Sequence, residues 1–154
     1  MSASVRAQTV AVATGSAVVA SGAWYAAFAD TLARYDPAYA AGAGTPAWVL
    51  PVELARSGAV ATAVAVLVDR METRGPGAAL RLGLGLWAAF PVVLLTGSVV
   101  HEQVPVPQAA IHAGGWLVKL LLVSTVVGRA TAVRPDTVGR WRRIGRALHQ
   151  RTAG

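Results

Sequence analysis

Two positively charged residues fall inside apolar segments that are long enough to cross a lipid bilayer. Arg56 and Lys119 each lie near the middle of such a segment, where an ionisable group costs on the order of 3 kcal/mol. Glu53 precedes Arg56 by three residues, so the two side chains share a helix face and can form an ion pair. These three residues form the centre of a candidate site.

Three more ionisable residues are expected in the outer half of the same bundle. His112 precedes Lys119 by seven residues, which places both on one face of a helix together with Trp116. His101 and Glu102 follow the third apolar segment. The candidate site therefore comprises Glu53, Arg56, His101, Glu102, His112 and Lys119.

Two main interpretations of this polar network remain open. In the first, Glu53 neutralises Arg56 and Lys119 together, with His112 hydrogen-bonded nearby, and the network only fixes the register of the helices. That arrangement leaves one surplus positive charge. In the second, Arg56 and Lys119 therefore form the floor of an outward-facing cavity that binds a carboxylate, a phosphate or a headgroup, and His112 relays protons.

A metal site and an enzyme active site are weaker alternatives. His101, Glu102 and His112 offer three ligand types, but they lack the fixed spacing of a zinc signature. Serines in apolar helices more often donate to a backbone carbonyl than attack a substrate. We therefore predict no catalytic residues, no metal and no cofactor.

The composition is that of an integral membrane protein. Of 154 residues, 55% are hydrophobic and only 14% are charged, whereas soluble proteins have about a quarter charged. The chain has no cysteine, which excludes disulfides and thiolate zinc sites. The net charge of +7 comes from arginines that flank apolar segments, a pattern that favours anionic lipids over nucleic acid as partners.

Four apolar segments position these residues. Each has about the 20 residues that a helix needs to cross a hydrocarbon core. They predict an all-α, four-helix membrane bundle over residues 1–134, with Pro91 opening or kinking the third helix. The segments are residues 9–28, 47–68, 78–100 and 109–128.

The first segment has an alternative interpretation as a signal peptide, because Arg6 precedes it and small residues around Phe28 follow it. Against this, Ala13, Ala17 and Ser21 recur every four residues and form a small-residue ridge suited to close helix packing. Gly83 and Gly85 suggest a similar close contact, and such faces also suit a homo-oligomer.

Arginine placement predicts the orientation. The two termini and the connection between the second and third segments carry nearly all flanking arginines, whereas the opposite connections carry only Arg34. By the positive-inside rule both termini are cytoplasmic, in the plasma (inner) membrane. Aromatic residues then gather at the outer interface: Trp24, Tyr25, Tyr35, Tyr39 and Trp48.

Residues 135–154 form a distinct basic tail. Apolar and basic residues alternate with helical spacing, which predicts an amphipathic helix on the inner leaflet. Its expected role is lipid binding or plain anchoring. The lipid-contacting residues are predicted to be Arg140, Trp141, Arg142, Arg143 and Arg146.

Short aromatic and glycine motifs in the segments resemble a known family. Gly-Ala-Trp-Tyr at 22–25, Gly-Leu-Trp at 85–87 and Ala-Ile-His-Ala-Gly at 110–114 resemble the bacterial family catalogued as domain of unknown function 1761. The likeness covers roughly residues 8–130, although Ala26 and Ala27 replace the glycine and proline that often precede the phenylalanine. The resemblance implies a small four-helix membrane protein without an established activity.

Two function hypotheses follow. The leading one is binding or passage of a small anionic or proton-coupled ligand through the polar network. The alternative is a structural or partner-binding membrane component with no substrate.

Overall fold

The computed structural model describes residues 3–40, 46–73 and 75–132. Four helical stretches are long and apolar enough to cross a membrane, and the described residues contain no strand, so the predicted all-α four-helix bundle is confirmed. The predicted basic tail, residues 135–154, lies outside the described residues. The spanning stretches are α1 (Ala3–Ala27), α3 (Val49–Arg70), α4 to α5 (Pro76–His101) and α6 (Val106–Ala132).

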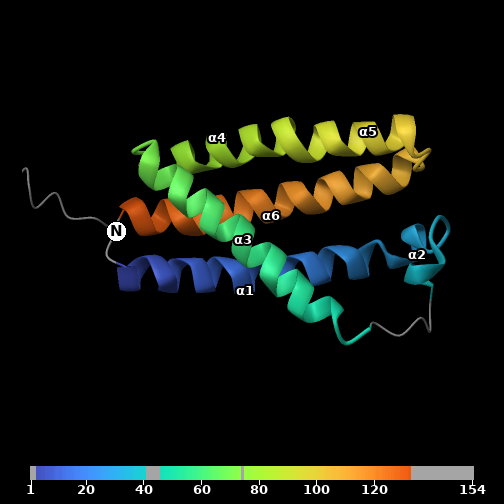
Figure 1. The fold of residues 1–154 in the computed structure, drawn as a ribbon, viewed down its shortest axis with the longest axis horizontal. Helices are drawn as coiled ribbons and strands as arrows, with labels where there is room; N and C mark the ends of the chain where they lie inside the picture. Colours follow the sequence, from blue (N-terminus) through green and yellow to red (C-terminus); the bar gives the residue numbers. More distant parts are fainter. Residues whose placement is uncertain (1–2, 41–45, 74, 133–154) are drawn as a thin grey trace, which may run out of the picture.

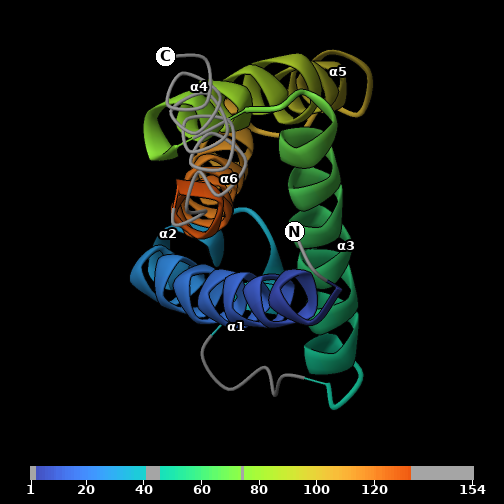
Figure 2. The same ribbon diagram turned by 90° about the vertical axis from the view of Figure 1, so that its left-hand side faces the viewer.

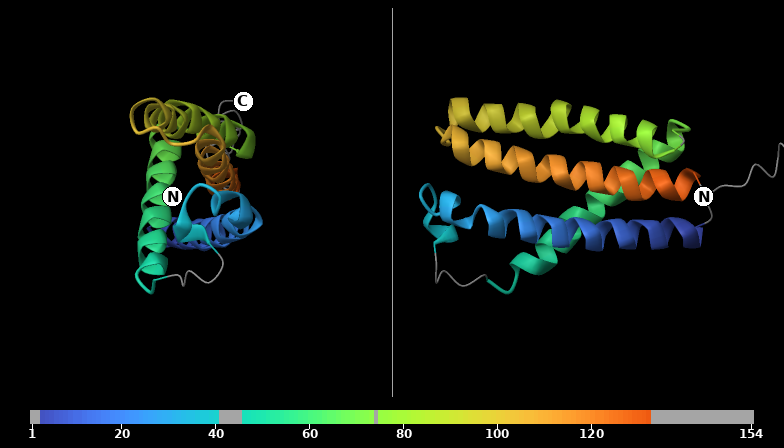
Figure 3. Two further views of the ribbon diagram at one scale, coloured as in Figure 1. Left: turned by 90° about the vertical axis from the view of Figure 1, so that its right-hand side faces the viewer. Right: turned by 180° about the vertical axis from the view of Figure 1, so that it is seen from behind.

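The helix α6 is central, and it contacts α1, α3, α4 and α5. Figure 1 shows α1, α6 and the α4–α5 stretch side by side along the long axis, while α3 crosses them obliquely. The end-on views show α3 flanking the other helices on one side (Figures 2 and 3). Because of this tilt, α3 meets α4 only near the turn that joins them, and it crosses α1 before its other end projects past that helix.

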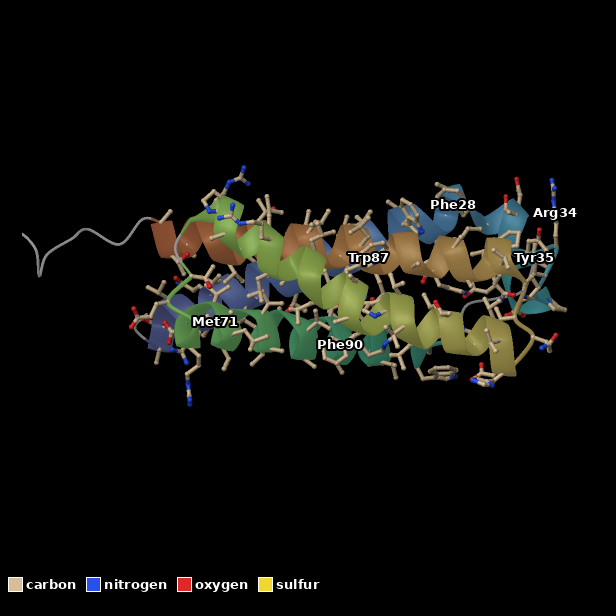
Figure 4. The ribbon with its side chains drawn as sticks, turned by 90° about the horizontal axis from the view of Figure 1, so that it is seen from above. Phe28, Arg34, Tyr35, Met71, Trp87 and Phe90 are labelled. Atoms are coloured by element: carbon tan, nitrogen blue, oxygen red, sulfur yellow. The ribbon has the colours of Figure 1, made fainter. Side chains whose placement is uncertain are left out.

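The two ends of the bundle differ. At one end, which we call the α2 end, lie the short helices α2 (Ala29–Leu32) and η1 (Pro37–Tyr39) and the turn between α5 and α6. At the other, which we call the Met71 end, lie the start of α1, the α3–α4 turn and the end of α6. Figure 4 shows Arg34 and Tyr35 at the first end and Met71 at the second.

The core is built from small residues, as close packing of membrane helices requires. Ala13, Ala17 and Ser21 are buried on one side of α1, so the predicted small-residue ridge is a packing face of the bundle. This ridge meets the buried residues of α3 and α6. The core cluster consists of Ala13, Ala17, Ala61, Val64, Ala65, Val68, Ala79, Leu120, Val123 and Val127.

Glycine allows α4 and α6 to approach closely at two levels. A Cβ added at Gly128 would lie 2.8 Å from the Cβ of Ala79, and one at Gly83 would lie 3.1 Å from the carbonyl oxygen of Leu120. Gly85, by contrast, faces open space. The expectation that both Gly83 and Gly85 serve close contact therefore holds for Gly83 alone.

Proline opens the third spanning stretch, as predicted. Between α4 (Pro76–Trp87) and α5 (Val93–His101), residues Ala88–Val92 form the π-helix η2 around Pro91. Proline has no N–H to complete an α-helical bond, so the backbone widens locally. Phe90, in this segment, is exposed on the surface of the bundle (Figure 4).

An ion pair fastens α3 to α1 at the Met71 end. Nη2 of Arg6 donates to Oδ2 of Asp69 at 2.7 Å, and both side chains are partly exposed. Pairs of this exposure contribute about 0 to 1 kcal/mol, so the contact orients α3 more than it stabilises the fold.

Candidate functional site

The carboxylate of Glu53 joins α3 to α6. Nζ of Lys119 donates a hydrogen bond to its Oε1, and the Ser57 hydroxyl donates to the same oxygen at 3.1 Å. The other oxygen, Oε2, lies 3.6 Å from Nη1 of Arg56 on the same helix. One carboxylate therefore faces two cations, and the closer partner is the lysine from the neighbouring helix.

The two cations differ in exposure. The side chain of Lys119 is 6% exposed, whereas that of Arg56 is 55% exposed. Both lie near the ring of Trp116, with the Arg56 Cζ 5.4 Å and the Lys119 Nζ 5.2 Å from its centroid. These distances fit cation–π attraction. The surplus positive charge of the trio is thus carried on the surface, by Arg56.

His112 belongs to a neighbouring aromatic cluster. Its Nδ1 lies 3.0 Å from the Tyr25 hydroxyl, and its ring centroid is 6.4 Å from that of Tyr39. The predicted hydrogen bonding of His112 thus goes to tyrosine rather than to the Glu53 carboxylate.

Tyr39 closes this cluster from the α2 end. It lies in η1, which begins after Asp36, whose carboxylate accepts from the backbone N–H of Ala38 at 2.9 Å. Burial, and then the nearby Asp36 carboxylate, raise the pKa of Tyr39 above its usual value. Its hydroxyl therefore remains a hydrogen-bond donor at neutral pH.

Two indole rings hold α6 in position. Nε1 of Trp24 donates to the carbonyl oxygen of Ile111 at 2.9 Å, and Nε1 of Trp87 donates to that of Ala113 at 2.8 Å. Gly114 makes room for the first ring, since a Cβ there would lie 2.5 Å from Trp24 Cζ2. The prediction that Trp24 and Tyr25 serve as interfacial aromatic residues is thus incomplete, because their polar atoms bond within the bundle.

Two of the six predicted site residues lie apart from this cluster. His101 ends α5 and Glu102 follows it, and both are exposed. Among residues 3–40, 46–73 and 75–132, no three side chains of histidine, cysteine, aspartate or glutamate lie close enough to hold a metal ion. The alternative metal site made by His101, Glu102 and His112 is therefore not formed.

The sequence analysis did not assign Tyr25, Tyr39 and Ser57 to the site. Ser57 is one turn from Glu53, so its hydrogen bond to that carboxylate could have been expected from spacing alone. Tyr25 could also have been proposed from the sequence, since it belongs to the Trp-Tyr motif. Tyr39 could not, because its position depends on the fold of the segment between α1 and α3.

The comparisons with known proteins identify a family. No curated protein and no solved structure matches the chain. The family described as protein of unknown function (DUF1761) matches residues 8–128, which include all of the Glu53 and His112 clusters. The chain therefore belongs to this family.

Proposed function

We propose that the protein binds an anionic group, a carboxylate or a phosphate, at Arg56 on the half of the bundle nearest the α2 end. The observation that carries the proposal is the unequal burial of the two cations. Lys119 is buried against Glu53, so it is neutralised within the chain, and the surplus charge is exposed at Arg56. A planar guanidinium matches the two oxygens of a carboxylate or phosphate.

The neighbouring groups support binding at this point. The Trp116 ring lies beside the guanidinium and limits its freedom, which lowers the entropy lost when an anion binds. The Glu53–Lys119 pair fixes the backbone that carries Arg56. The proposal is limited to binding, and a surface pocket of about 440 Å³ lies elsewhere, at the Met71 end, lined by Ala3, Arg6, Ala7, Val10 and Thr62.

A second candidate function rests on the same ion pair. The hydrogen bond from Lys119 to Glu53 connects α6 to α3, as a register-fixing pair would. On this alternative the protein is a structural or partner-binding membrane component, and Arg56 binds no ligand.

Thermal unfolding of the purified protein in detergent separates the two. We expect a panel of anions, comprising phosphate, acetate and an anionic phospholipid, to include at least one that raises the melting temperature of the wild type, since ligands that bind only the folded state stabilise it. Arg56→Gln should abolish that rise. Arg34→Gln, which removes an exposed arginine outside the spanning helices, should keep it. If no anion acts through Arg56, the structural alternative stands.

A further inference from the structure

Arg56 lies on an exposed stripe of α3 that is otherwise apolar as far as Arg70, the last residue of the helix. The residues that precede and follow it at helical spacing, Val52, Ala59, Ala63 and Val66, are all exposed. Steps of four and three residues keep these side chains on one stripe. The face thus combines a guanidinium with a strip of small and branched apolar side chains leading toward the Met71 end.

The chain offers no spare carboxylate for Arg56 at this depth. The four spanning helices contain two acidic residues, Glu53 and Asp69. Glu53 carries one negative charge that Lys119 and Arg56 share, with Nη1 of Arg56 3.6 Å from Oε2, and Asp69 is paired with Arg6. A second copy of the protein would bring the same two carboxylates, already engaged. An additional anion that balances the surplus positive charge at Arg56 must therefore come from the membrane or from solution.

The shape of the site favours the membrane. Sites for small ligands are concave and bury about 70 to 90% of the ligand surface. A side chain that is 55% exposed on the flank of a helix does not enclose a small anion in that way. A lipid needs no such enclosure, because its acyl chains remain in the bilayer while one of them lies along the protein.

The dimensions of the stripe fit one acyl chain. Arg56 lies seven residues, or about 10 Å along the helix, from the first residue of α3, and Val66 lies ten residues, or about 15 Å, beyond Arg56. Ala59 and Ala63 have short side chains, so this part of α3 is a shallow track. A phosphate held by Arg56 would leave its acyl chain to follow that track inward.

We propose that the anionic group bound at Arg56 is the phosphate of a phospholipid whose acyl chain packs along Ala59, Ala63 and Val66. The inference rests on the proposed function and names its ligand class. The guanidinium supplies the charge and the fork of donors, Trp116 keeps it oriented, and the Glu53–Lys119 pair holds α3 in place.

The test compares three probes on the purified protein in detergent: phosphatidylglycerol, a galactosyl diacylglycerol with the same acyl chains but no phosphate, and inorganic phosphate. Retained lipid is counted by native mass spectrometry, and melting temperatures are measured in parallel. We expect phosphatidylglycerol to be retained and to raise the melting temperature, and the galactolipid to do neither. Arg56→Gln should weaken phosphatidylglycerol binding by about tenfold or more, which corresponds to about 1.4 kcal/mol.

Two further variants keep the result interpretable. Arg34→Gln is the matched control and should bind phosphatidylglycerol as the wild type does. Arg56→Lys keeps the charge but loses the planar fork, so intermediate binding is expected. Glu53 keeps its lysine partner in both variants, so we expect both to fold. If Arg56→Gln nevertheless fails to fold, phosphatidylglycerol binding by Arg56→Lys is compared with that of the wild type instead.

The outcomes distinguish this inference from the function on which it rests. Inorganic phosphate could raise the melting temperature through Arg56 while both lipids are retained equally. In that case the assignment of a phospholipid as the ligand is wrong, and the anion site at Arg56 stands. Equal retention of phosphatidylglycerol by the wild type and Arg56→Gln also overturns the lipid assignment. If none of the probes depends on Arg56, both proposals fail.

Discussion

Lys119 and Arg56 share the Glu53 carboxylate but differ in burial, and this difference determines what each residue can do. Lys119 is almost fully buried, so its ammonium group has lost its hydration shell. The hydrogen bond to Glu53 must compensate for that loss. Arg56 is half exposed and lies 3.6 Å from the same group, so it depends on Glu53 much less. Stability and ligand binding should therefore respond to different substitutions.

The first prediction concerns the buried pair. Glu53→Gln and Lys119→Met should each destabilise the protein, by roughly 3 to 5 kcal/mol for the change that leaves a buried charge unpaired. The double variant should recover much of the loss, because it removes both charges and their desolvation cost. The measurement is a double-variant cycle of thermal unfolding in detergent.

Arg56→Met is the control for this cycle. We expect it to change stability little and not to rescue Glu53→Gln, since Lys119 would still be unpaired. Rescue by Arg56→Met but not by Lys119→Met would show that the pair within α3 is the important one.

Local spacing predicted part of this arrangement. The three-residue separation of Glu53 and Arg56 placed them on one face, and the seven-residue separation of His112 and Lys119 did the same on α6. Which cation is buried could not be predicted, because that depends on the tilt of α3 across α6. The sequence also does not show that His101 and Glu102, at the end of α5, are exposed and lie apart from the Glu53 carboxylate.

At the scale of helices, α4 and α6 approach each other through glycine. Gly83 and Gly85 lie two residues apart on α4, one against α6 and one facing open space. They form a matched pair in which the same substitution meets different surroundings.

We predict that Gly83→Ala destabilises the protein by about 1 to 3 kcal/mol, because the added methyl group overfills the contact with Leu120 and Ser124. Gly85→Ala should cause no loss, since alanine is the better helix former by about 1 kcal/mol. Thermal unfolding of the two variants checks this. Equal losses of stability in the two variants would mean that glycine is needed for the flexibility of α4 and not for its contact with α6.

The length of the apolar runs predicted all four spanning helices, and the missing N–H of Pro91 predicted the irregularity in the third. The short helices α2 and η1 were not predicted. Their residues have no apolar period, and the conformation of η1 depends on capping by Asp36 and on the contact of Tyr39 with His112.

For the whole molecule, the arrangement of charges favours one orientation in the membrane. Arg6, Arg70, Arg81 and Arg129 lie toward the Met71 end, and Arg34 lies at the α2 end. By the positive-inside rule, we expect the Met71 end to lie in the cytoplasm.

We predict that reporters fused to the C-terminus and inserted directly after Met71 report a cytoplasmic location. A reporter inserted within residues 38–44 should report the outside, as the arginine asymmetry requires. An outside C-terminus would reverse the orientation and would place Arg56 in the half of the membrane nearest the cytoplasm.

The two ion pairs that join α3 to neighbouring helices also have a consequence for hydrophobic matching. A spanning helix usually adapts to a thicker or thinner bilayer by changing its tilt. Here α3, about 33 Å long at 1.5 Å per residue, is held to α1 by Asp69 near one end and to α6 by Glu53 near the other. Changing its angle would strain one of these contacts. A change of tilt is therefore opposed mainly by the buried Glu53–Lys119 pair, since the exposed Arg6–Asp69 pair contributes only about 0 to 1 kcal/mol.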